Sequence, residues 1–85
     1  MVFGYEFYHM LDNFITFAQK YPNEIGEIFI ESIKSGNIQY HDEKKMKEFV
    51  KILYEKGAKD NADIICRIFV ANGYSYLQGI YLENN

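Results

Sequence analysis

The chain of 85 residues is long enough for one domain and too short for two, so we expect residues 1–85 to fold as a single unit. Hydrophobic residues make up 48% and charged residues 25%, a balance that is typical of globular proteins and excludes a disordered chain. Nine basic and twelve acidic residues give a net charge of -3 with no block of like charge, which argues against strong attraction to nucleic acid or a membrane surface.

The cysteine content and the length of the apolar runs indicate in which cellular compartment the protein is expected. A single cysteine, Cys66, excludes an internal disulfide, and it lies in an apolar run where a thiol usually packs as a small hydrophobe. No run approaches the ~18 apolar residues of a membrane span, and no basic segment precedes a long apolar one. We therefore expect a cytoplasmic protein without membrane association. Frequent Lys, Ile, Asn and Tyr with one Arg are typical of AT-rich genes and favour a low-GC bacterium, its phage or a mobile element as the source.

Apolar residues at helical spacing predict a first helix over about residues 4–20, which Pro22 ends. Proline is also well suited to the first position of a helix, so Pro22 should open the second one. Residues 35–37, which are Ser-Gly-Asn, are expected to end this second helix. Its buried face is predicted to consist of Ile25, Ile28, Phe29 and Ile33.

The third helix has the clearest pattern in the chain. Residues 38–41 form a short connector, and Asp42 is a plausible N-cap because its carboxylate can accept a backbone N–H of the first turn. Gly57 is expected to end the helix in the left-handed conformation. The apolar side chains of this helix follow the i, i+3, i+4, i+7 pattern, and they are Met46, Phe49, Val50, Leu53 and Tyr54.

A fourth helix is predicted from about Asp60 to Asn72. Apolar residues cover most of its circumference, so we expect it to be the central and most buried helix. Its narrow polar strip carries Asp63 and Arg67, which have the i, i+4 spacing that favours an ion pair.

A short last helix should follow Gly73. Ser75 and Gln78 have the spacing of a capping box, and residues 83–85 are expected to fray. The sequence therefore predicts an all-α fold, a compact single-domain bundle of four main helices plus a short C-terminal fifth.

Residues 49–62 resemble the end of an ankyrin repeat. The Thr-Pro-Leu-His turn that opens such repeats is absent, and nothing recurs at a period of about 33 residues. We interpret the resemblance as a shared way of ending a helix, and not as membership of that family.

The residues that could act in catalysis are His9, His41, Cys66 and scattered carboxylates, and no nucleophile is paired with a base. His9 with Asp12, and His41 with its acidic neighbours, each offer two metal ligands, fewer than a zinc site needs. We therefore predict that the protein is not an enzyme and holds neither a metal nor another cofactor.

A nucleic-acid-binding regulator is the alternative prediction. The third and fourth helices, joined across Gly57, have the outline of a helix-turn-helix. Acidic residues in the first turn of the fourth helix would face phosphates unfavourably, so nucleic acid is the less favoured partner. The residues that would bind it are Lys44, Lys47 and Lys51 on the third helix.

Tyrosines at polar positions favour protein binding, because their large apolar ring and polar tip make them frequent interface anchors. Both groups of tyrosines could instead pack inside the domain. The first candidate surface is Tyr5, Tyr8, His9 and Asp12, and the second is Tyr74, Tyr76 and Tyr81.

The sequence thus predicts a small non-catalytic regulator or inhibitor, encoded by a phage or mobile element. It should act through an aromatic-rich helical face on another protein or on a second copy of itself in a homodimer.

Overall fold

The computed structural model describes the backbone of residues 3–34 and 42–85 and the side chains of residues 11–34 and 42–85. Within these residues the chain is helical and has no strand, which confirms the all-α prediction. A 3-10 turn, Ser75–Leu77, precedes the last helix. The α-helices are α1 (Phe3–Ala18), α2 (Pro22–Lys34), α3 (Glu43–Glu55), α4 (Lys59–Ala71) and α5 (Gln78–Glu83).

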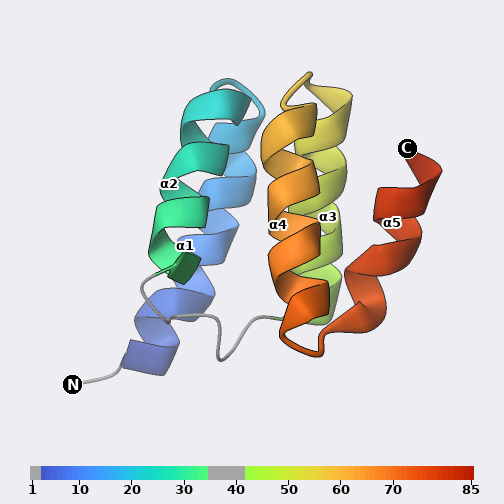
Figure 1. The fold of residues 1–85 in the computed structure, drawn as a ribbon. Coiled ribbons are helices and arrows are strands. Elements are labelled where there is room, and N and C mark those ends of the chain that lie inside the picture. The colour runs from blue at the N-terminus through green and yellow to red at the C-terminus, as the bar shows by residue number, and fades with distance from the viewer. Residues whose placement is uncertain (1–2, 35–41) are drawn as a thin grey trace.

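The long helices form two antiparallel hairpins, α1 with α2 and α3 with α4 (Figure 1). The hairpins pack side by side, so that α1 lies against α3 and α2 lies against α4. The short α5 packs against α3 and α4, on the side away from the first hairpin. The radius of gyration is 11.8 Å, close to the value of about 12 Å for a compact chain of this length.

Several predicted helix ends are confirmed. Pro22 is the first residue of α2. The Asp42 carboxylate accepts a hydrogen bond from the backbone N–H of Lys45 at 3.0 Å, and so caps α3. Gly57 has a φ of 93° after the end of α3, a conformation that residues with a Cβ rarely adopt. The predicted end of the second helix, residues 35–37, and the connector, residues 38–41, lie outside the described residues.

Other details of the helix ends were predicted wrongly. The helix α4 begins at Lys59, close to the predicted start at about Asp60, but its N-cap is Ala58, which makes no side-chain hydrogen bond. The capping box of Ser75 and Gln78 does not form, because Ser75 is already the first residue of the 3-10 turn. Neither that turn nor α5 has a side-chain cap.

The core centres on phenylalanine rings, one from each long helix. The ring centroids of Phe29 and Phe49 are 5.0 Å apart, and that of Phe14 is 5.8 Å from Phe29. Phe69 continues the cluster, with its centroid 6.4 Å from Phe29. Because each ring belongs to a different helix, these contacts fix how the two hairpins sit against each other.

The fourth helix is less completely buried than its sequence predicted. Ile64 and Val70 are 38% and 37% exposed. The helix is in contact with α2, α3 and α5, and these neighbours leave part of its circumference open to solvent. Ile28 on α2, predicted to be buried, is 53% exposed.

Gly26 allows α2 and α4 to approach closely. A Cβ placed on Gly26 would lie 2.8 Å from the Cβ of Asn61 on α4, nearer than two such atoms can come. The Asn61 amide also donates a hydrogen bond to the carbonyl oxygen of Asn23, at 3.1 Å. Gly26 and the hydrogen bond between Asn61 and Asn23 therefore both determine the distance between α2 and α4.

We expect Phe49→Ala to destabilise the protein by about 3–5 kcal/mol, because the fully buried ring would leave a cavity between the two hairpins. The measurement is the free energy of unfolding in urea, followed by circular dichroism. Phe17→Ala is the matched control, since Phe17 is 52% exposed and its loss should cost only about 0.5 kcal/mol. Equal losses for the two variants would contradict the assignment of the core.

We expect Gly26→Ala to destabilise the protein by about 1–2 kcal/mol, because overpacking against Asn61 outweighs the better helix propensity of alanine. Gly79→Ala in α5 is the control. A Cβ there meets no atom within 4 Å, so the same substitution should be neutral or stabilise by up to about 1 kcal/mol. Thermal unfolding of both variants measures the difference, and a stabilised Gly26→Ala variant would refute the close approach of α2 and α4.

Candidate functional site

The carboxylate of Asp63 lies at the centre of a hydrogen-bond network that joins α3, α4 and the C-terminal residue. Asp63 is only 9% exposed. One of its oxygens accepts hydrogen bonds from the Tyr54 hydroxyl at 2.5 Å and the Asn85 amide at 2.9 Å. The other oxygen forms an ion pair with the Lys59 amine at 2.9 Å. The buried charge is therefore satisfied by three donors.

This network changes the protonation behaviour of both partners. Burial alone would raise the pKa of Asp63, but the hydrogen bonds from Tyr54, Asn85 and Lys59 outweigh it and leave the pKa below its usual value. Burial, and then the hydrogen bond to Asp63, raise the pKa of the Tyr54 hydroxyl above its usual value. The pair is therefore held as an ionised carboxylate and a neutral phenol at neutral pH.

The end of the chain is held in place and is not frayed as predicted. Besides its bond to Asp63, the side chain of Asn85 accepts a hydrogen bond from Lys59 at 2.7 Å. It also donates one to the backbone oxygen of Tyr81 at 2.9 Å. The bonds to Lys59 and Asp63 fasten the residues after α5 to α4.

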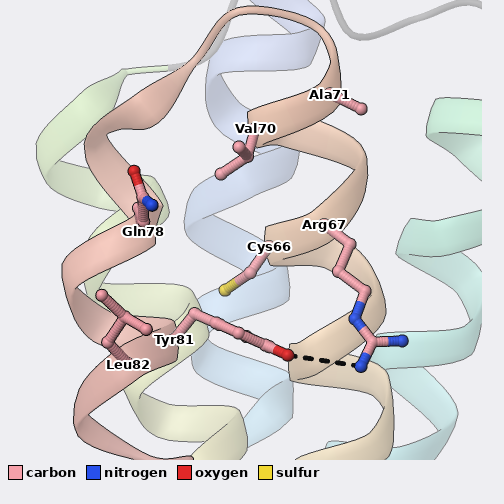
Figure 2. A pocket seen from close by; sticks show the side chains of 7 residues that line it. All are labelled: Cys66, Arg67, Val70, Ala71, Gln78, Tyr81 and Leu82. Atoms are coloured by element: carbon pink, nitrogen blue, oxygen red, sulfur yellow. Dashed lines mark hydrogen bonds between the residues drawn. The ribbon is translucent and has the colours of Figure 1, made fainter.

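The predicted ion pair between Asp63 and Arg67 does not form, because Asp63 is already occupied by Tyr54, Lys59 and Asn85. The Arg67 guanidinium instead donates a hydrogen bond to the Tyr81 hydroxyl at 3.3 Å. Its central carbon lies 5.8 Å from the centroid of the Tyr81 ring, within the range of a cation–π contact. The Tyr81 side chain therefore reaches from α5 to the guanidinium on α4 (Figure 2).

An apolar groove with a volume of about 300 Å³ lies between α4 and α5 (Figure 2). Val70 of α4 and Leu82 of α5 line it and are 37% and 63% exposed. Arg67 and Tyr81 stand together at one end (Figure 2). The groove is lined by Cys66, Arg67, Val70, Ala71, Gln78, Tyr81 and Leu82.

Cys66 forms part of the groove's inner wall but is fully buried. Burial raises the pKa of its thiol to about 11. The thiol therefore stays protonated at neutral pH and is a poor nucleophile, in line with the predicted role as a small hydrophobe.

The first predicted tyrosine surface can be placed only in part. The side chains of Tyr5, Tyr8 and His9 lie outside the described residues, although their backbone is part of α1. Asp12 forms an ion pair with Lys45 of α3 at 2.7 Å. This carboxylate therefore stands at the seam between α1 and α3.

The second predicted tyrosine surface is divided by the fold. The rings of Tyr74 and Tyr76 pack against Phe69, with centroid distances of 5.7 and 6.3 Å, and both tyrosines are half-buried. Burial, and then the charge of Glu43, raise the pKa of Tyr76 to about 12. Tyr81 lies apart from them, in the groove between α4 and α5.

The lysines of the alternative prediction lie together on α3. Lys44, Lys47 and Lys51 line a shallow groove that also contains acidic side chains, Glu48 and Glu55. Lys47 is paired with Glu43 at 3.0 Å. The helices α3 and α4 run side by side along their length (Figure 1), whereas a helix-turn-helix crosses its two helices steeply.

Sequence reasoning missed Val70, Leu82 and the position of Arg67 as parts of one site. Val70 belongs to the apolar run that predicts a mostly buried fourth helix, and no pattern in the sequence singles out Leu82. A signal was present in the last helix, where Gln78, Tyr81 and Leu82 share one face at i, i+3, i+4 spacing. The spacing does not reveal that this face borders α4.

The described part of the chain also bears on metal binding and membrane spanning. No group of three or more His, Cys, Asp or Glu residues could hold a metal ion there. None of the described helices is long and apolar enough to cross a membrane. In comparisons with known proteins, no family model, curated protein or solved structure matches the chain.

We expect Asp63→Asn to destabilise the protein by about 1.5–3 kcal/mol at pH 7, because the amide loses the charge that Lys59 and Tyr54 stabilise. The folded-state pKa of Asp63 is lowered, so its stabilising contribution is present above the unfolded pKa of about 3.9 and is lost as pH falls through the folded pKa. Urea unfolding at several pH values should therefore show the gap between wild type and variant narrowing below about pH 4.

Asp60→Asn is the control for the change of charge, because Asp60 lies on the same helix and is exposed. It should change stability by about 0.5 kcal/mol at most. A cost for Asp63→Asn that stays constant across this pH range would show that the carboxylate charge is not what stabilises the network.

Proposed function

We propose that this protein is a non-catalytic regulator or inhibitor that binds another protein through the groove between α4 and α5. The observation that carries the proposal is the exposure of Leu82 and Val70 on the two helices that border an apolar groove. Covering these side chains with a partner would remove apolar surface from water, the main favourable term in most protein association.

The polar end of the groove supports the same function. Tyrosine and arginine are enriched among the residues that dominate binding energy at interfaces. Tyr81, one of the tyrosines predicted as an anchor, stands here beside Arg67. An apolar groove that ends in a few polar groups is a common form of protein-binding site.

The other exposed surfaces support binding less well. Phe17, Tyr21 and Ile28 are each about half exposed on the first hairpin, but none of them lines a described groove. The lysine groove on α3 is interspersed with glutamates, which weakens its attraction to phosphate. The groove between α4 and α5 therefore remains the best supported surface.

The proposal is tested by affinity capture from a nuclease-treated lysate of a low-GC bacterium, comparing Leu82→Asp with the wild type. We expect a stoichiometric protein to be recovered with the wild type and lost with Leu82→Asp, because a carboxylate in the groove would have to be desolvated on binding. The amount of partner recovered per mole of bait is the measured quantity.

Ile28→Asp is the matched control, since it places the same charge on an exposed apolar position of the first hairpin. It should retain the partner, and circular dichroism should show both variants folded. Recovery lost equally in the two variants would refute the groove as the binding surface. Recovery that occurs only in a parallel capture without nuclease, and that is lost in Lys47→Glu with Lys51→Glu, would favour the alternative function.

A further inference from the structure

The charge of Arg67 distinguishes the groove from an ordinary apolar surface. Lys45, Lys47 and Lys59 each have a carboxylate partner within 3.0 Å. Within the described residues no carboxylate lies within ion-pair distance of Arg67, whose guanidinium instead donates a hydrogen bond to the neutral hydroxyl of Tyr81. A guanidinium has five N–H donors, so most of its hydrogen-bonding capacity is available to a ligand.

The structure explains why this cation lacks a carboxylate partner. The acidic residue one turn earlier on α4 is Asp63, which is taken up by Lys59, Tyr54 and Asn85. Asp60 and Asp63 line a depression that also includes Arg67 and is distinct from the groove. A carboxylate of a partner would therefore be repelled least by Asp60 and Asp63 if it approached the guanidinium from the groove.

Contact with Tyr81 favours a defined position of the guanidinium. The hydroxyl accepts its hydrogen bond, and the ring lies within cation–π range (Figure 2). An arginine that is already oriented loses less side-chain entropy when it binds. Its planar group then suits a carboxylate, to which it can donate two parallel hydrogen bonds.

The shape of the groove favours a protein helix over a small molecule. Its volume of about 300 Å³ is at the lower end of the range of about 300–1,000 Å³ for small-molecule pockets. Leu82 is 63% exposed, so much of its apolar surface would stay uncovered by a ligand confined to the groove. A helix laid between α4 and α5 could insert a ridge of side chains and cover Leu82 and Val70 as well.

We infer that the groove between α4 and α5 binds an amphipathic helix of a partner protein, whose apolar ridge enters the groove and whose Asp or Glu, one helical turn away, pairs with Arg67. This inference rests on the proposed function and specifies the chemistry of the partner. The apolar ridge supplies contact area, and the carboxylate sets the direction and register in which the helix lies.

The test is a selection from a displayed library of short helical peptides in which one face is randomised. Wild-type protein and Leu82→Asp are used as parallel baits, so that peptides bound elsewhere are removed. We expect the wild type to enrich peptides with aliphatic residues at i, i+3 or i+4 spacing and an acidic residue one turn from them.

The role of the carboxylate is then measured with a synthetic copy of an enriched peptide and its Glu→Gln or Asp→Asn version. We expect the acidic peptide to bind wild type about tenfold more tightly than the amide version, as for a charge-assisted pair at an interface. Arg67→Gln should abolish this preference. Lys51→Gln removes the same charge on α3 and should leave the preference unchanged, which controls for general electrostatic attraction.

The outcomes separate the two proposals. Peptides that require Leu82 but bind equally as acid and amide would overturn the inferred partner chemistry and leave the groove as the binding surface. A preference for the acid that survives in Arg67→Gln would also overturn the inference. Failure to enrich any peptide over the Leu82→Asp bait would overturn the inferred helical partner, whereas the proposed function is decided by the lysate capture with Leu82→Asp.

Discussion

The contact of phenylalanine rings from the four long helices is the constraint on which the rest of the structure depends. Phe49 is fully buried, and its ring lies 5.0 Å from Phe29 and 6.2 Å from Phe14. Phe69 joins the two hairpins to the C-terminal region, because Tyr74 and Tyr76 pack against it. In a chain this short, large rings supply much of the apolar area that a small core can bury.

The Asp63 network holds the C-terminal residues against α4, as the phenylalanine rings hold the two hairpins together. Removing a carboxylate from water is costly unless donors replace the lost hydration, and here Tyr54, Lys59 and Asn85 do so. Because Asn85 also accepts a hydrogen bond from Lys59, the network holds the residues after α5 against α4. The network helps to hold α5 where it borders the groove, and Tyr81 of α5 contacts Arg67 at one end of that groove. A structural network thus shapes the candidate binding surface.

The proposed function depends on a difference in packing between Tyr74 and Tyr76, before α5, and Tyr81 within α5. Tyr74 and Tyr76 contribute rings to the packing around Phe69, so much of their apolar surface is used inside the domain. Tyr81 contributes to a groove that has exposed Val70 and Leu82 beside it. Residue type alone would rank the three tyrosines equally as interface anchors, whereas their neighbours divide them between packing and a surface site.

The sequence by itself determined the helices and most of their ends. Helical periodicity located every long helix, and Pro22, Asp42 and Gly57 marked boundaries, because these signals act within a few residues of the chain. Only the tertiary structure decided the partners of Asp63, the exposure of Val70 and the place of Arg67. Each of these depends on a residue from another helix, such as Tyr54 or Tyr81, and spacing along one helix cannot show which helix lies beside it. The sequence therefore determined the elements, and packing between helices decided the site.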